Sequence, residues 1–71
     1  MMTLMELLWD PRYEESVVVV DVLDPVTKDF ITSVSGSWAN DDILSLSDNT
    51  VSSFDYIRRV DILYVKVLND N

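Results

Sequence analysis

The chain of 71 residues contains no cysteine, no histidine and only one glycine. Without Cys and His it cannot form a disulfide, a zinc finger, a His-based catalytic triad or a thiol nucleophile. Gly36 alone cannot build a glycine-rich phosphate-binding loop. Lys and Arg are also scarce, because five of them stand against 13 Asp and Glu, which gives a formal net charge of −8. These absences exclude many classes of enzyme and metalloprotein.

The shortage of basic residues also limits the binding partners. Phosphate backbones and anionic membranes are both contacted through Lys and Arg, so we expect neither direct nucleic-acid binding nor membrane binding. Acidity attracts a basic partner protein and speeds its association, although it also serves solubility alone. The longest apolar run, Val17–Val20, is too short to span a membrane. The N-terminal segment lacks the basic region of a signal peptide, so we expect a cytoplasmic location.

What the sequence does contain is typical of a folded protein. Hydrophobic residues make up 48% and charged residues 25%, and no repeat, low-complexity tract or linker divides the chain. We therefore expect a single small acidic domain over residues 1–71. A domain of this size buries little surface, so self-association or a partner would add to its stability.

The first half of the chain predicts one helix and two strands. Thr3-Leu4-Met5-Glu6 has the spacing of a capping box, and Asp10-Pro11 ends the helix that follows. The β-branched run Val17–Leu23 predicts a strand, and Phe30–Val34 predicts a second one. The six residues Asp24–Asp29 between them suit a hairpin loop.

The second half predicts a further helix and a final strand. Asn40 has the character of an N-cap, with Asp41 and Asp42 in the first turn. The segment Val51–Arg59 is compatible with either a helix or a strand, whereas Val60–Leu68 has the period of two that favours a strand. We therefore expect an α+β fold with a small three-stranded, mainly antiparallel sheet and two short helices, in the order helix, strand, strand, helix, strand.

The strands have apolar residues on both faces, which suggests a surface for association. We expect two short helices to cover one face and to leave the other exposed. The residues assigned to this exposed face are Val18, Val20, Val22, Ile62 and Tyr64.

No pattern of residues predicts a catalytic, cofactor or metal site. Asp41, Asp42 and Asp48 lack the alternation and the central Gly of an EF-hand, and helix capping explains the first two. A glycosidase would need a cleft that holds a carboxylic acid with a raised pKa, which so short a chain rarely forms. The serines have no His or Cys partner and no Gly-x-Ser-x-Gly context. We therefore expect no enzymatic activity.

The aromatic and charged residues are better candidates for contact with a partner protein. Trp9 directly follows the first helix, so we expect it to complete the core, whereas Trp38 lies in a polar loop and is the better contact residue. Arg58-Arg59 suits an internal salt bridge or a solvated strand edge. Asp21 and Asp61 lie inside predicted strands, where acids are disfavoured. The predicted partner-binding residues are Asp21, Asp61, Glu14, Glu15, Trp38, Asp41 and Asp42.

Three segments together resemble small acidic proteins encoded by bacteriophages and mobile elements. They are the leucine-rich start Met2–Leu8, the Val-rich hairpin Val17–Val34 and the apolar strand Val60–Leu68. Some proteins of this kind, anti-CRISPR proteins among them, inhibit host defence nucleases by occupying basic nucleic-acid channels. The resemblance implies a non-enzymatic inhibitor that mimics the charge of DNA and binds a basic partner such as a nuclease. The alternative is a structural or assembly protein that forms a homodimer through a sheet face or a strand edge.

Overall fold

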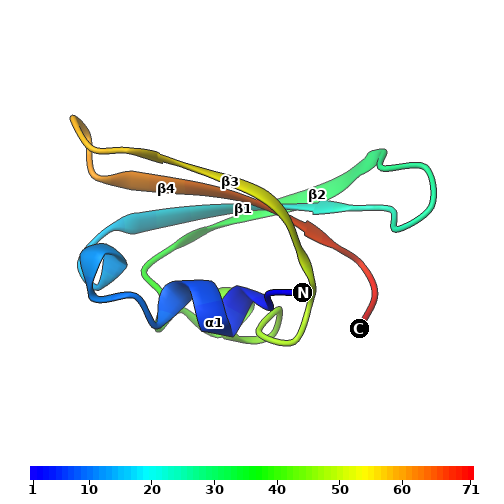
Figure 1. The fold of residues 1–71 in the computed structure, drawn as a ribbon, viewed down its shortest axis with the longest axis horizontal. Helices are drawn as coiled ribbons and strands as arrows, with labels where there is room; N and C mark the ends of the chain where they lie inside the picture. The colour runs from blue at the N-terminus through cyan, green and yellow to red at the C-terminus, as the bar shows by residue number, and fades with distance from the viewer.

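The computed structural model describes every residue from Met1 to Asn71, and its main element is a sheet of four strands (Figure 1). A capped helix and a short 3-10 turn precede the first strand, and a second short helix separates the two halves of the sheet. The elements are α1 (Leu4–Leu8), η1 (Pro11–Tyr13), β1 (Val17–Leu23), β2 (Phe30–Gly36), α2 (Asp41–Leu44), β3 (Val51–Ile57) and β4 (Ile62–Leu68).

The sheet is mixed and its strand order is β2-β1-β4-β3. Two antiparallel hairpins, β1–β2 and β3–β4, lie side by side, and their inner strands β1 and β4 pair in parallel. The predicted three-stranded, mainly antiparallel sheet is therefore wrong. The prediction omitted the strand β3, and it did not include the parallel pairing of β1 with β4. No local pattern encodes that pairing, because the two strands lie far apart in the sequence.

The strand β3 occupies most of the segment Val51–Arg59, which the sequence left open between helix and strand. The register of β3 on β4 shifts between Val51 and Ser53, as at a β-bulge. A bulge inserts a residue and so breaks the period of two. The shift places Val51 and Phe54 on the same face although they are three residues apart, since they pair with Val67 and Val65. Ile57 pairs with Ile62 on the opposite face, so the helical spacing in the sequence is coincidental.

The parallel register decides which face of the sheet is buried. Val18 pairs with Leu63, and every second residue after them pairs in the same way, Val20 with Val65 and Val22 with Val67. The buried side chains on this inner face are Val18, Val20, Val22, Leu63, Val65 and Val67. The predicted exposed face is therefore wrong, because it combined three inner residues with Ile62 and Tyr64, which point to the opposite face.

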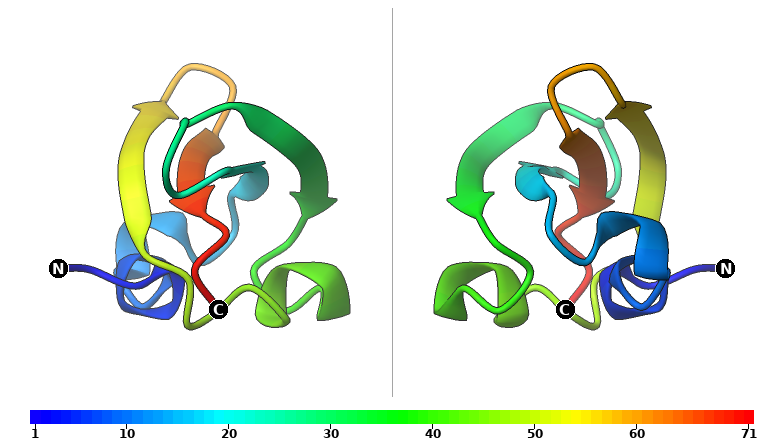
Figure 2. Two further views of the ribbon diagram at one scale, coloured as in Figure 1. Left: turned by 90° about the vertical axis from the view of Figure 1, so that its right-hand side faces the viewer. Right: turned by 90° about the vertical axis from the view of Figure 1, so that its left-hand side faces the viewer.

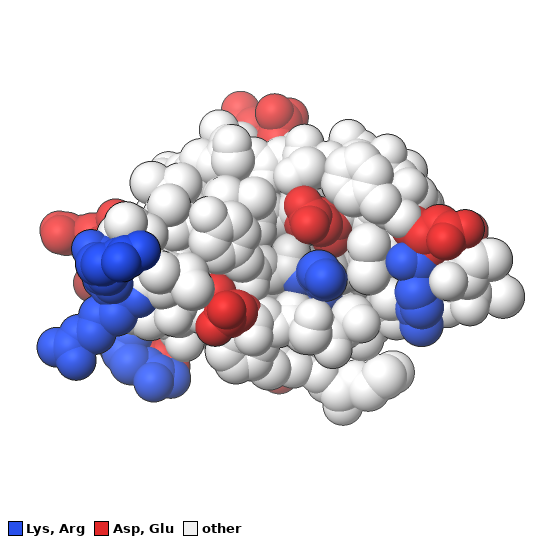
Figure 3. Space-filling view, turned by 90° about the horizontal axis from the view of Figure 1, so that it is seen from above, with Lys and Arg blue, Asp and Glu red and all other residues white.

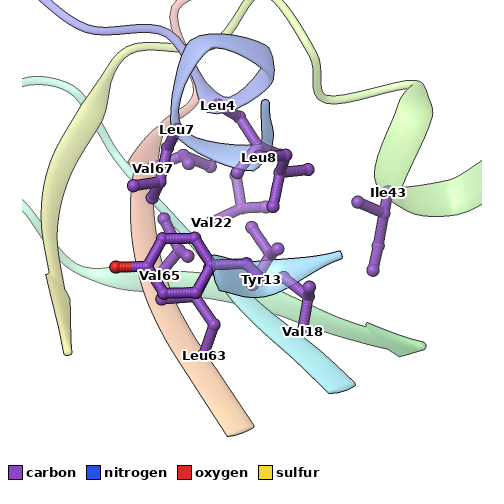
Figure 4. Packing of buried hydrophobic residues seen from close by; sticks show 11 residues of the cluster. Leu4, Leu7, Leu8, Tyr13, Val18, Val22, Ile43, Leu63, Val65 and Val67 are labelled. Atoms are coloured by element: carbon purple, nitrogen blue, oxygen red, sulfur yellow. The ribbon is translucent and has the colours of Figure 1, made fainter. Parts of the chain in front are cut away.

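The two helices and the connections beside them lie against the inner face (Figures 1 and 4). Leu4, Leu7 and Leu8 of α1 and Ile43 of α2 are buried there, together with Tyr13 of η1. No element covers the outer face, where Val17, Tyr64 and other side chains are exposed to solvent. The molecule therefore has two layers, one of helices and one of strands.

Side-chain hydrogen bonds cap the N-termini of both helices, as the sequence predicts. The backbone N–H of Thr3 donates to Glu6 Oε1 at 3.0 Å, and the Glu6 N–H donates to Thr3 Oγ1 at 3.3 Å, which completes the capping box. Asn40 Oδ1 accepts the N–H of Asp42 at 2.9 Å and caps α2. None of the helices is long and apolar enough to cross a membrane.

Candidate functional site

The strongest candidate site is a cleft that two tryptophans line. Trp9 is the C-terminal cap of α1, and Trp38 lies in the connection between β2 and α2. The cleft has a volume of about 360 Å³, which is within the range of sites that take a small molecule or a single protruding side chain. It is lined by Leu8, Trp9, Asp10, Pro11, Glu14 and Trp38.

Trp9 is 78% exposed, so the expectation that it completes the core is wrong. The buried face of α1 is already occupied by Leu4, Leu7 and Leu8. One residue further along a helix, the side chain points about 100° away from that face. Asp10-Pro11 then ends the helix directly after Trp9. Trp38 is 40% exposed, in agreement with its predicted position in a loop.

Asp10 and Glu14 give the cleft two carboxylates with different partners. Asp10 caps η1 by accepting the N–H of Arg12 at 3.0 Å, and it also binds the Arg12 guanidinium, with Nη2 at 2.6 Å from Oδ2. The side-chain and backbone hydrogen bonds from Arg12 lower the pKa of Asp10. This is the only ion pair in the chain, so Glu14 has no cationic partner.

The charge around the cleft is strongly acidic. Four of the five basic residues belong to the sheet layer: Lys28 in the β1–β2 loop, Arg58 and Arg59 in the β3–β4 turn, and Lys66 on β4. The β3–β4 turn lies at the same end of the molecule as η1 (Figure 1). Figure 3, which views the outer face of the sheet, shows blue side chains at its middle and at both ends. The helical side has only Arg12, which Asp10 already binds. The acids of α1, α2 and their flanking connections are Glu6, Asp10, Glu14, Glu15, Asp41, Asp42 and Asp48.

The structure brings together some of the predicted contact residues and separates others. Glu14 and Trp38 line the same cleft. Glu15 is exposed directly beside Glu14, and Asp41 and Asp42 are exposed in the first turn of α2, which follows Trp38 closely in the chain. These five predicted residues therefore belong to one side of the molecule.

Asp21 lies outside this group, on the outer face of the sheet. It is aligned with Lys66 on the neighbouring strand β4, but the two side chains do not form an ion pair. Both line a second, smaller hollow of about 200 Å³, together with Tyr64 and Asp55. The charged residues that line this hollow are Lys66, Asp21 and Asp55, so its charge is more balanced than that of the cleft. Its aromatic residues are Phe54 and Tyr64.

Asp61 is the second predicted contact residue that lies apart from the cleft. It belongs to the turn between β3 and β4, one residue before β4 begins, with a φ of 54°. Its Oδ1 accepts the hydroxyls of Ser16 at 2.5 Å and Tyr56 at 2.6 Å. The hydrogen bond from Ser16, followed by that from Tyr56, lowers the pKa of Asp61. Its carboxylate therefore has a structural role within the chain.

Comparison with known proteins adds no relative. No family model, curated protein or solved structure matches the chain. The resemblance to phage-encoded inhibitors stays a prediction. No group of three or more acidic side chains lies close enough together to hold a metal ion.

The sequence contained a signal for the part of the site that was missed. Leu8, Trp9, Asp10 and Pro11 line the cleft, but their local patterns predict only structural roles, with Trp9 in the core and Asp10-Pro11 at the end of the helix. A helical projection places Trp9 off the face that Leu4, Leu7 and Leu8 share. A large aromatic residue off the apolar face of a helix, followed by a chain-breaking Asp-Pro, indicates an exposed side chain held by a rigid turn.

Proposed function

We propose that the protein is a non-enzymatic binding module that attaches to a basic surface of a larger protein through the two-tryptophan cleft. The observation that carries this proposal is the convergence of Trp9 and Trp38, from distant parts of the chain, on a cleft that also contains Asp10 and Glu14. Exposed indole rings attract cations through their faces, and carboxylates add charge-assisted hydrogen bonds. A Lys or Arg side chain of the partner has the chemistry to occupy such a site.

The acidic helical side supports the same function at longer range. Two of its carboxylates, Asp10 and Glu14, line the cleft. The negative charge of this side attracts a basic protein before contact, and the apolar rings slow its dissociation afterwards. The concrete partner that we propose is the nucleic-acid-binding groove of a host defence nuclease, in the cytoplasm of a bacterium that carries a phage. The protein would then inhibit by competition, with its carboxylates in place of the phosphates of DNA.

The first experiment tests the cleft with a lysine- and arginine-rich peptide, monitored by tryptophan fluorescence. We expect Trp38→Ala to weaken peptide binding by on the order of tenfold, which corresponds to about 1.4 kcal/mol. Tyr64→Ala is the matched control, because Tyr64 is an exposed aromatic residue on the opposite face (45% exposed). Equal losses of affinity in the two variants would contradict a role for the cleft.

A second pair of variants separates a local carboxylate contact from net charge. Glu14→Gln and Glu15→Gln remove the same charge from neighbouring exposed residues, but only Glu14 lines the cleft. We expect Glu14→Gln to weaken peptide binding clearly more than Glu15→Gln does. Equal effects would show that the peptide responds to the acidic field alone.

The choice of partner is tested with basic nucleases at low and high salt. Because the proposed association is electrostatic, we expect affinity to fall as salt rises and nucleic acid to compete for the same surface. An affinity that is indifferent to both salt and nucleic acid would overturn the charge-mimicry mechanism, while leaving peptide binding by the cleft to be judged on its own measurements.

A further inference from the structure

The two edges of the sheet differ in how well they are protected from pairing with another strand. At one edge, β3 is bulged near its start and carries Asp55 in its middle. The N-terminal segment also lies beside its beginning, since the Val51 N–H donates to the Met2 carbonyl at 2.8 Å. Bulges, charges and covering segments are the usual means by which proteins prevent edge-to-edge pairing.

The other edge, β2, has little of this protection. Its sequence, Phe30–Gly36, contains no charged residue and no proline, and it is the only strand of the four without a charge. Phe30 is 63% exposed and Ile31 is 48% exposed. Figure 2 shows β2 at one side of the molecule, with α2 below its end and no element beside its outer edge. Its one protective feature is a register shift between Thr32 and Phe30, as at a β-bulge, which lies at the start of the strand and leaves Thr32–Gly36 regularly paired.

The hydrogen bonds of β1 show which backbone groups of β2 face outward. The Val17 N–H donates to the Asp61 carbonyl at 3.1 Å, and the Leu23 carbonyl accepts the Asn69 N–H at 2.8 Å. Odd-numbered residues of β1 therefore bond toward β4, and even-numbered ones toward β2. Val20 pairs with Val34, so Val34 bonds inward. The N–H and carbonyl groups of Ser33 and Ser35, which alternate with it, are directed to the free edge.

We propose that β2 binds the β2 strand of a second copy of this chain, in an antiparallel pair with Ser33 on the two-fold axis. In this register Ser33 lies opposite Ser33 of the second copy and exchanges two hydrogen bonds with it. Thr32 lies opposite Val34 of the second copy, and Ile31, at the register shift of β2, lies beside Ser35 of the second copy at the end of the paired segment. The two four-stranded sheets become one continuous sheet of eight strands.

The absence of charge on β2 favours a second copy of the chain as the partner strand. Two chains of net charge −8 repel each other over most of their surfaces. Pairing through β2 brings together the only strands that carry no charge, so no like charges lie directly opposite each other in the paired strands. The pair is also self-complementary, because the outward N–H and carbonyl groups of Ser33 face the carbonyl and N–H groups of Ser33 in the second copy across a two-fold axis.

Sedimentation equilibrium over a wide concentration range tests the dimer with three variants. Ser33→Pro removes an outward N–H and leaves the β1 hydrogen bonds in place, since Pro is tolerated where the N–H of an edge strand faces solvent. Ile31→Lys places a charge at the pair and is matched by Val26→Lys, the same change in charge at an exposed valine in the β1–β2 loop (86% exposed). Circular dichroism confirms that each variant is folded.

We expect the wild type and Val26→Lys to reach twice the 8.2 kDa of one chain as concentration rises. The dissociation constant of the dimer should be at least an order of magnitude higher for Ile31→Lys and for folded Ser33→Pro. In Ile31→Lys, which keeps the Ser33 N–H, this amide should also lose its protection from hydrogen exchange. A wild type that stays monomeric up to millimolar concentration would overturn the proposal. So would a dimer that both β2 variants retain, or one that Val26→Lys weakens as much as Ile31→Lys.

Discussion

Asp61 shows how a single acidic residue can hold two parts of the chain together. Its carboxylate accepts the hydroxyl of Ser16, which precedes β1, and that of Tyr56 on β3. The Tyr56 ring also packs edge-to-face on buried Tyr13, with ring centroids 5.1 Å apart. Asp61 adopts a left-handed backbone conformation, which Asp and Asn tolerate better than most residues. The contact with a partner that the sequence predicts for Asp61 stays a prediction, and the structure shows that its carboxylate also has an internal role.

The pH dependence of stability follows from this cluster. The Ser16 and Tyr56 hydroxyls lower the pKa of Asp61, so its contribution is present at neutral pH and is lost as the pH falls through the folded-state pKa. The hydrogen bond to Asp61 raises the pKa of Tyr56, so that contribution is lost as the pH rises through the raised value. Urea unfolding across pH should show a decline at both extremes. We expect Ser16→Ala to cost about 1 kcal/mol at neutral pH and to flatten the acid decline; an unchanged acid profile would contradict this.

Substitutions of Asp61 itself separate its backbone role from its charge. Asp61→Asn keeps both a hydrogen-bond acceptor and tolerance of the left-handed conformation, while Asp61→Ala keeps neither. We therefore expect Asp61→Ala to lower the urea midpoint clearly more than Asp61→Asn. If the two variants unfold at the same midpoint, the negative charge is the dominant contribution.

At the scale of elements, α1 depends on its cap because it has only five residues. A helix this short is not stable by its own backbone hydrogen bonds and relies on capping and on packing against the sheet. Thr3→Ala removes the hydroxyl that accepts the Glu6 N–H, and we expect a loss of about 1 kcal/mol in chemical unfolding. No change in unfolding free energy would mean that packing of the three leucines alone maintains the helix.

Most elements were predictable because their signals are local. The capping box of α1, the Asn40 cap of α2 and the β-branched run of β1 each depend on residues a few positions apart. The sequence did not decide between helix and strand for the segment that forms β3, because its bulge disrupts the alternation that identifies a strand. β2 runs on to Gly36, two residues beyond its predicted end.

At the scale of the whole molecule, the pairing of β1 with β4 determines which residues stabilise the fold. Leu63 and Tyr64 are neighbours in β4, yet Leu63 is fully buried and Tyr64 is 45% exposed. We expect Leu63→Ala to destabilise the protein by about 3 kcal/mol, because it leaves a cavity in the core. Tyr64→Ala should cost less than about 1 kcal/mol. Thermal or urea unfolding distinguishes the two, and the reverse order would contradict the assignment of the faces.

The distribution of charge is likewise a property of the whole molecule. The sequence gives the excess of acids, but not that the helical side contains only one base, already bound by Asp10. Glu14 and Trp38 were predicted separately as contact residues, and the fold places them in one cleft. Asp21 and Asp61 were predicted with them and lie elsewhere, because a residue's local context does not tell which surface it joins.

The sequence by itself determined the composition-based exclusions, the net charge and the helices and strands with intact local signals. Those properties depend on residue chemistry or on contacts between near neighbours, where backbone sterics and capping dominate. The tertiary structure alone decided that β1 and β4 pair in parallel across forty-five positions, from Val17 to Ile62. The buried face, the free edge at β2 and the meeting of the two tryptophans all follow from that pairing and from the packing of the helices on it. Such long-range contacts are selected by the burial of apolar surface over the whole chain.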